Sequence, residues 1–230
     1  MNQYIWLNFL SKKLQAILMA SSLFCLFIPF GTKAQTNPVI LVMGDSLSAE
    51  YGLARGTGWV KLLEDQLHKE ASPWTVFNAS ISGETSSGGI SRLPKLLEQK
   101  KPGIVLLELG ANDALRGLSI QESDRNLRKM IQLSKSSGAK VLLFGMQIPP
   151  NYGQEYTKQF QDLYPKLARQ EQVELVPFFL KNVASDINLF QADRMHPNEK
   201  AQAILFKNVW GAMAPYKHCL RVNKQSSDKS

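Results

Sequence analysis

The chain has 230 residues, of which 44% are hydrophobic and 20% are charged. This length and composition suit one domain with a single hydrophobic core, and they exclude a chain that is disordered throughout. The formal net charge is +8. No stripe of basic residues interleaved with aromatic residues occurs along the sequence, so we expect no nucleic-acid partner.

The first 34 residues have the pattern of a secretory signal peptide. Two lysines and no acidic residue precede an almost uninterrupted apolar run over residues 14–30, and small residues stand at positions −3 and −1 of a cleavage site after Ala34. An uncleaved membrane anchor is the alternative, although the apolar run is near the lower length limit for a spanning helix. We therefore predict a periplasmic or secreted protein with a signal peptide at residues 1–34 and one folded domain at residues 35–214.

After the leader, short apolar runs alternate with segments in which apolar residues recur at helical spacing. Strands are predicted at residues 39–43, 75–78, 104–109, 141–144 and 173–176. Helices are predicted at residues 59–69, 90–99, 121–137, 156–170 and 198–213, with a bend at Pro165. This alternation predicts an α/β domain of three layers, in which a five-stranded parallel sheet lies between helices. Residues 215–230 are predicted to form a disordered basic tail.

Most of the unusual polar residues stand in four loops. GDSLS (residues 44–48) follows the first strand, and a segment rich in Ser and Gly (residues 79–89) follows the second. GAND (residues 110–113) follows the third strand, and DRMHP (residues 193–197) precedes the last helix. Ligands of parallel α/β sheets bind outside the carboxyl ends of the strands. We therefore expect the four loops to converge on one site at that edge.

The residue types in these loops fit nucleophilic catalysis. A serine hydroxyl is a poor nucleophile until a base removes its proton, and His196 can do this for Ser46 because the unperturbed pKa of imidazole is about 6.5. Asp193, three residues earlier, can hold the imidazole in the required tautomer. The Ser46 N–H, the Gly83 N–H and the Asn112 side-chain amide are candidate donors to an oxyanion.

Together, GDSLS, the Gly83 loop, GAND and DRMH resemble the four sequence blocks of the GDSL or SGNH hydrolase family. The segments NASISGET, LLELGAND, MQIPPNYG, YPKLA and VPFF are most similar to its branch of periplasmic bacterial acyl-CoA thioesterases and lysophospholipases, often called arylesterases. The resemblance implies the flavodoxin-like fold of the family and hydrolysis of esters or thioesters through an acyl-enzyme. It implies Ser46 as nucleophile, Asp193 and His196 as the rest of the triad, and Gly83 and Asn112 as oxyanion donors.

Three positions depart from the residues that are common in this branch, namely Glu84, Ala111 and Met195. These departures put the substrate preference in doubt more than the activity. With three histidines and no phosphate-cradling glycine loop, the sequence predicts neither a metal site nor a cofactor.

The segment after the fourth strand should border the pocket. Ile148, Pro149, Asn151 and Tyr152 are predicted to contact the acyl chain, because apolar walls with few polar groups suit such a substrate. We expect a monomer that acts on a small-molecule acyl ester or thioester and makes at most weak contact with a membrane surface. Two alternatives stay open: a carbohydrate O-acetylesterase with the same sequence blocks, and a lipid-binding protein without catalytic activity.

Overall fold

The structure, a computed structural model, describes residues 37–221. Within these residues, five parallel strands form one sheet in the order β2-β1-β3-β4-β5. The strands are β1 (Val39–Gly44), β2 (Thr75–Asn78), β3 (Ile104–Glu108), β4 (Lys140–Phe144) and β5 (Glu174–Val176). The predicted five-stranded parallel sheet is thereby confirmed.

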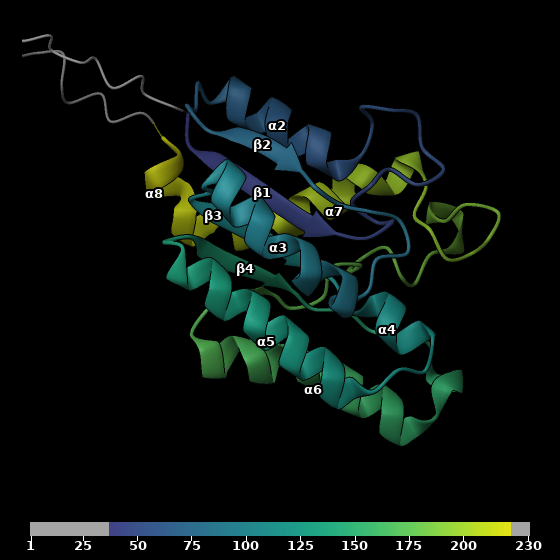
Figure 1. The fold of residues 1–230 in the computed structure, drawn as a ribbon. Helices are drawn as coiled ribbons and strands as arrows, with labels where there is room; N and C mark the ends of the chain where they lie inside the picture. Colours follow the sequence, from purple (N-terminus) through teal and green to yellow (C-terminus); the bar gives the residue numbers. More distant parts are fainter. Residues whose placement is uncertain (1–36, 222–230) are drawn as a thin grey trace, which may run out of the picture. The chain divides into compact units, whose positions relative to one another are not determined.

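Helices cover both faces of this sheet. The α-helices are α2 (Trp59–Lys69), α3 (Ser86–Lys100), α4 (Ala111–Leu115), α5 (Ile120–Ser136), α6 (Gln154–Glu171), α7 (Glu199–Ala212) and α8 (Lys217–Leu220). Short 3-10 helices are η2 (Pro150–Tyr152), η3 (Ile187–Leu189) and η4 (Ala214–Tyr216). Helices α3, α5 and α6 pack side by side on one face, and α2 packs against α7 on the other (Figure 1). The predicted three-layer α/β architecture is confirmed.

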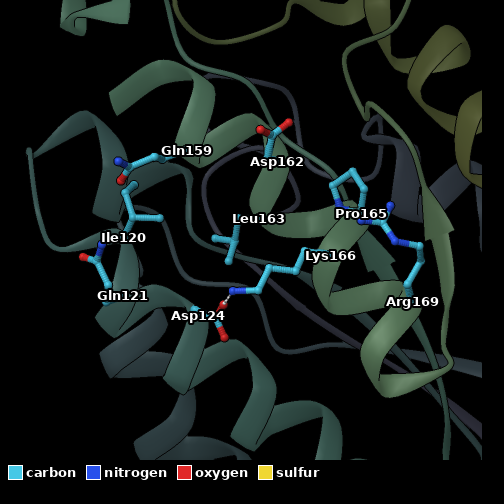
Figure 2. A pocket seen from close by; sticks show the side chains of 9 residues that line it. All are labelled: Ile120, Gln121, Asp124, Gln159, Asp162, Leu163, Pro165, Lys166 and Arg169. Atoms are coloured by element: carbon cyan, nitrogen blue, oxygen red, sulfur yellow. Dashed lines mark hydrogen bonds and ion pairs between the residues drawn. The ribbon is translucent and has the colours of Figure 1, made fainter. Parts of the chain in front are cut away.

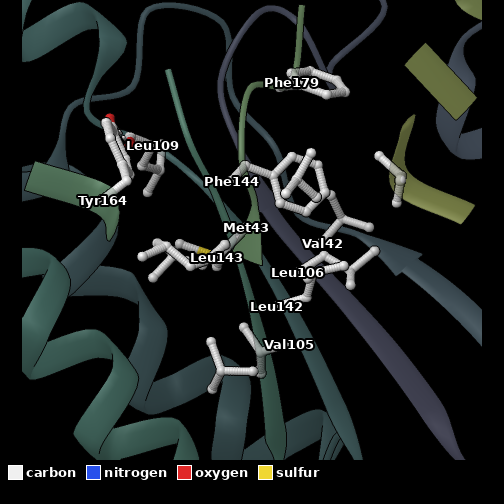
Figure 3. Close-up of a cluster of buried hydrophobic side chains, with 14 of the residues drawn as sticks. Val42, Met43, Val105, Leu106, Leu109, Leu142, Leu143, Phe144, Tyr164 and Phe179 are labelled. Atoms are coloured by element: carbon white, nitrogen blue, oxygen red, sulfur yellow. Dashed lines mark hydrogen bonds between the residues drawn. The ribbon is translucent and has the colours of Figure 1, made fainter. Parts of the chain in front are cut away.

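The core lies on the two faces of the central strands, whose residues are almost all buried. Val42, Leu106 and Leu142 are aligned across β1, β3 and β4 and are fully buried (Figure 3). Such continuous apolar runs are typical of parallel strands that helices cover on both sides. Near the carboxyl end of β4, the Phe144 ring lies 5.1 Å from that of Phe179, between centroids. This packing holds the carboxyl edge of the sheet, from which the site loops emerge.

Helix α3 begins at Ser86, four residues before the predicted start at residue 90. The Thr85 hydroxyl caps it by accepting a hydrogen bond from the Gly88 N–H at 3.3 Å. Glycine has a low helix propensity, so the sequence of this first turn favoured a loop. A Cβ at Gly89 would lie 2.4 Å from Leu109, which shows that the glycine lets the helix approach the end of β3 closely.

The predicted disordered tail is wrong for residues 215–221, because η4 and α8 fold back onto the core. Tyr216 donates its hydroxyl to the Val141 carbonyl at 2.8 Å, and Leu220 is only 1% exposed. The buried side chains of Tyr216 and Leu220 therefore anchor this segment to the core, although most of its other residues are polar. The rest of that tail and the predicted signal peptide lie outside the described residues. Among residues 37–221, no helix is both long and apolar enough to cross a membrane.

Candidate active site

Ser46, His196 and Asp193 form a hydrogen-bonded chain at the carboxyl edge of the sheet. The His196 Nε2 lies 3.0 Å from the Ser46 Oγ, and the His196 Nδ1 lies 2.7 Å from the Asp193 Oδ2. Ser46 follows β1, whereas the other two residues precede α7 and are about 150 positions away in sequence. The structure thus brings together the three residues that the sequence predicts to be a triad, in the order that proton transfer requires.

A tight turn presents Ser46 at the end of β1. The Asp45 Oδ1 accepts the Leu47 N–H at 3.0 Å, and the Asp45 carbonyl accepts the Ser48 and Ala49 N–H groups at 3.2 and 2.9 Å. Aspartate often closes a turn in this way, by bonding the backbone two residues ahead. Gly44 leaves no room for a side chain, since a Cβ there would lie 2.6 Å from a carboxylate oxygen of Glu108.

Asp193 organises the loop that carries His196. Its Oδ1 accepts the N–H groups of Met195 and His196 at 2.9 and 3.0 Å, while its Oδ2 faces the imidazole. The hydrogen bond from the His196 backbone, joined by those from its ring and from Met195, lowers the pKa of Asp193 to about 2. Asp193 is therefore ionised at neutral pH and requires a proton on the Nδ1 of His196.

Two of the three predicted oxyanion donors are backbone groups with no competing acceptor. Within the described residues, neither the Ser46 N–H nor the Gly83 N–H donates a hydrogen bond. Gly83 has φ +78°, a left-handed conformation that suits glycine, and its carbonyl accepts the Arg116 guanidinium at 2.9 Å. The Asn112 Nδ2 donates to the Asp45 Oδ2 at 2.9 Å and to the Glu84 carbonyl at 3.1 Å.

A cleft of about 570 Å³ opens beside Ser46 and His196. Most of its wall is apolar and comes from the loops after β1, β3, β4 and β5, namely Leu47, Leu115, Met146, Ile148, Pro149, Phe178, Leu180, Ile187 and Phe190. Ile148 and Pro149 line it as predicted, whereas Asn151 and Tyr152 do not. The Tyr152 hydroxyl instead donates to the Leu115 carbonyl at 3.1 Å, which directs this side chain to the end of α4.

Two features of the site were missed by the sequence reasoning. The Tyr51 ring packs on the imidazole of His196, with 4.4 Å between centroids and 41° between ring planes. Phe178 and Leu180 supply cleft wall from the loop after β5. The only sequence signal for the Tyr51 contact was an aromatic residue shortly after GDSLS. The place of Phe178 and Leu180 in the cleft wall depends on how the loops converge, which no local sequence pattern shows.

A second cleft, of about 600 Å³, lies between α5 and α6 and is lined by charged and amide side chains together with Ile120, Leu163 and Pro165 (Figure 2). The Lys166 Nζ lies 2.9 Å from the Asp124 Oδ2 within it. It is separate from the four site loops, and none of the predicted site residues lines it.

Known proteins of one family resemble this chain in sequence. Residues 42–204 match the model of the GDSL-like lipase/acylhydrolase family. The chain is 46% identical to esterase TesA of Pseudomonas aeruginosa over 191 residues, which are 83% of this chain and 95% of that protein. It is 46% identical to an arylesterase of Vibrio mimicus over 77% of this chain and 88% of the relative. For thioesterase 1/protease 1/lysophospholipase L1 of Escherichia coli K12, the identity is 42% over 80% and 86% of the two chains.

Solved structures show the same fold. The crystal structure of TesA superposes with a TM-score of 0.75 at 48% identity, covering 77% of this chain and 98% of the other. The psychrotrophic esterase EstA from Pseudoalteromonas sp. gives a TM-score of 0.75 at 41% identity, over 78% and 98% of the chains. An esterase of the SGNH-hydrolase family, AlinE4, gives a TM-score of 0.66 at 37% identity, over 78% and 96%. The chain therefore belongs to the GDSL-like lipase/acylhydrolase family, as the sequence blocks indicated.

Proposed function

We propose that this protein is a serine hydrolase that cleaves carboxylic ester or thioester bonds of acyl substrates. The observation that carries the proposal is the hydrogen-bonded chain from Ser46 through His196 to Asp193 beside an apolar cleft. In this proposal Ser46 is the nucleophile, His196 the general base and Asp193 the residue that orients the base. The family membership and the names of the relatives point to the same chemistry.

The reaction runs in two steps. The His196 Nε2 takes the proton of the Ser46 hydroxyl while the Ser46 Oγ attacks the acyl carbonyl carbon, and the resulting oxyanion accepts hydrogen bonds from the Ser46 N–H, the Gly83 N–H and the Asn112 amide. The protonated His196 then gives its proton to the leaving alcohol or thiol, which leaves an acyl-enzyme. A water molecule, deprotonated by His196, attacks that ester, and collapse of the second oxyanion releases the carboxylic acid and returns the proton to Ser46.

The cleft favours an acyl group larger than acetyl. Its volume of about 570 Å³ and its wall of leucine, isoleucine, methionine and phenylalanine side chains suit an alkyl or aryl chain, because apolar area gains free energy when it leaves water. Relatives are named arylesterase, thioesterase and lysophospholipase. We therefore propose medium or long acyl esters and acyl thioesters as substrates, including lysophospholipids.

The test is hydrolysis of p-nitrophenyl esters from acetyl to dodecanoyl, followed by acyl-CoA and lysophospholipid. Ser46→Ala should abolish turnover. Ser185→Ala is the matched control, because this serine lines the same cleft and lies outside the triad. Turnover that persists or rises beyond butanoyl supports the acyl proposal. Turnover of acetyl alone indicates an O-acetylesterase, and a folded protein with no turnover at all indicates a lipid-binding protein.

We also propose a periplasmic or secreted monomer whose leader, residues 1–34, is removed after Ala34. The support is the apolar run over residues 14–30, which follows two lysines. When the full chain is expressed, the intact mass of the protein in the periplasmic or medium fraction should correspond to a start at Gln35, and size exclusion should give the mass of one chain. An uncleaved chain in the membrane fraction would contradict the cleavage.

Weak contact with a membrane surface is the remaining part of the proposal. In the described part of the chain, the exposed large hydrophobic side chains all lie in the stretches between the carboxyl end of a strand and the long helix that follows it (α2, α3, α5, α6 or α7), namely Tyr51, Ile81, Leu118, Tyr152, Ile187 and Met195. Co-sedimentation with phosphatidylglycerol vesicles should detect this contact, and no binding at low salt would contradict it.

A further inference from the structure

Two carboxyl groups are buried directly beneath the turn that carries Ser46. Asp45 is 1% exposed and Glu108 is fully buried. Glu108 ends β3, where it is aligned with Gly44 at the end of β1. Its Oε2 accepts the Ser48 hydroxyl at 2.7 Å and the Asp45 N–H at 3.2 Å. The mechanism above uses neither carboxyl group, although burying an ionised carboxyl costs considerable free energy unless it is paired or hydrogen-bonded.

The side chain of Asp45 connects the nucleophile turn to Asn112. Its Oδ1 accepts the Leu47 N–H at 3.0 Å, and its Oδ2 accepts the Asn112 Nδ2 at 2.9 Å. A carboxylate can only accept, so it pairs with the nitrogen of the Asn112 amide and excludes the orientation in which the amide oxygen takes that place. The other N–H of Asn112 makes the longer bond, 3.1 Å to the Glu84 carbonyl, and is the one that a developing oxyanion can share with that carbonyl.

We propose that Asp45 is a positioning residue, which keeps the nitrogen of the Asn112 amide directed at the oxyanion. Glu108 beneath it is protonated in this proposal, so the pair carries one negative charge, which lies on Asp45. The inference rests on the proposed function, in which Asn112 is an oxyanion donor. Asp45 does not touch the substrate in this scheme, and its effect on turnover passes through Asn112.

The environment of Glu108 supports this assignment of the proton. Within the described residues its Oε1 has no hydrogen-bond partner, so no donor at this oxygen compensates a negative charge in the core. Burial, and next the charge of Asp45, raise the pKa of Glu108 well above its usual range. Two carboxylates this close do not both ionise readily.

Asp45 is the member of the pair that can ionise. Burial raises its pKa to about 6, but the hydrogen bonds from Leu47 and Asn112 and the charge of His196 favour its ionised form. Asp113 opposes the charge, and Tyr164, a further titratable group near the pair, is a buried phenol whose pKa is well above its usual value. The proton of the pair is therefore held preferentially on Glu108, and the negative charge on Asp45.

The test is a double-mutant cycle on kcat for a p-nitrophenyl ester at pH 8, with the full mature protein. Asp45→Asn should lower kcat about 10- to 100-fold, a part of the roughly 10²- to 10³-fold loss for a missing oxyanion donor, and should change KM by less than about threefold. In the Asn112→Ala background the same substitution should lower kcat by less than about threefold, because no amide is left to position.

Asp113→Asn is the matched control for the cycle. Asp113 is also a buried carboxyl next to the site, but it accepts hydrogen bonds from Ser86 and Ser123 and none from Asn112. Its substitution should therefore change kcat by the same factor in both backgrounds. If Asp45→Asn folds poorly, Asp45→Ser keeps a hydroxyl that can accept the Leu47 N–H but is too short to reach Asn112, and it should show the same loss.

The outcomes separate the inference from the proposed function. An equal loss from Asp45→Asn in both backgrounds, or no loss from Asn112→Ala, would overturn the positioning role while Ser46→Ala still abolishes turnover. If Ser46→Ala retains turnover, the proposed function fails, whatever the cycle shows. A loss that disappears in the Asn112→Ala background supports the inference, because a merely structural role of Asp45 would act in both.

Discussion

Asp193→Asn replaces one carboxylate oxygen of the proposed triad with an NH₂ group. The hydrogen bonds of the loop then decide which tautomer His196 adopts. The Oδ1 position of Asp193 faces two donors, the N–H groups of Met195 and His196. The amide oxygen of an asparagine would occupy this position, so its NH₂ group would face the Nδ1 of His196. That nitrogen must then accept, the ring proton moves to Nε2, and the ring can no longer take the proton of Ser46.

The size of the expected loss of activity follows from the free energy needed to hold the asparagine amide in the opposite orientation. Turning the NH₂ toward the two backbone N–H groups would remove their acceptor, which costs about 1–3 kcal/mol for a buried donor and less in this exposed loop, where water can replace it. Even a total of about 2 kcal/mol makes the productive tautomer roughly 30-fold less populated. Loss of the negative charge beside the imidazolium adds to this. We therefore expect kcat/KM to fall by between about 30-fold and 10⁴-fold, the upper figure being typical of this change in a serine triad.

The assay is steady-state hydrolysis of p-nitrophenyl butanoate at pH 8, with the thermal melting temperature as a check on folding. Asp186→Asn serves as the control, because Asp186 caps the nearby η3 and has no contact with His196. Activity of Asp193→Asn within about tenfold of wild type, at an unchanged KM, would refute the tautomer argument. The pKa of about 2 predicts in addition that Asp193 is ionised at the pH of the assay.

Three further predictions concern stability. Burial raises the pKa of Asp45 to about 6, so the native state holds its proton more tightly than the unfolded chain does. This contribution to stability is present below about pH 4 and is lost as the pH rises through 6. Asp45→Asn removes it, so the melting temperature of this variant should change less with pH in this window than that of the wild type. Phe144→Ala should lower the free energy of unfolding in urea by about 3–5 kcal/mol, since a buried ring in contact with Phe179 is removed. Gly110→Ala should lower the melting temperature more than Gly117→Ala, because both have positive φ but only at Gly110 would a Cβ lie 2.5 Å from another side chain, the hydroxyl of Tyr164.

The sheet could be predicted because its strands are short apolar runs next to glycine or proline, a pattern that buried parallel strands share. The convergence of Ser46, Asn112 and His196 could be predicted because all three follow strands or precede a helix at one edge. The start of α3 could not, since Gly88 and Gly89 lower the local helix propensity and only packing against Leu109 explains them.

The cleft wall and the support beneath Ser46 also depend on tertiary structure. Tyr152 follows β4 as expected, but its hydrogen bond to the Leu115 carbonyl places it outside the cleft lining. Glu108 lies in an apolar run and gives no local sign that its carboxyl contacts Ser48, 60 positions away. Contacts of this kind join residues that are far apart in the sequence, so a local pattern of apolar and polar residues does not predict them.

Covalent labelling tests the identity of the nucleophile most directly. The mature protein is incubated with an alkyl fluorophosphonate, and intact mass and peptide mapping locate the adduct. We expect one adduct per chain on Ser46, formed in parallel with loss of esterase activity, and much slower labelling of His196→Ala because the base is gone. Complete inactivation with the adduct on another serine, such as Ser185, and with Ser46 unmodified, would contradict the proposed mechanism.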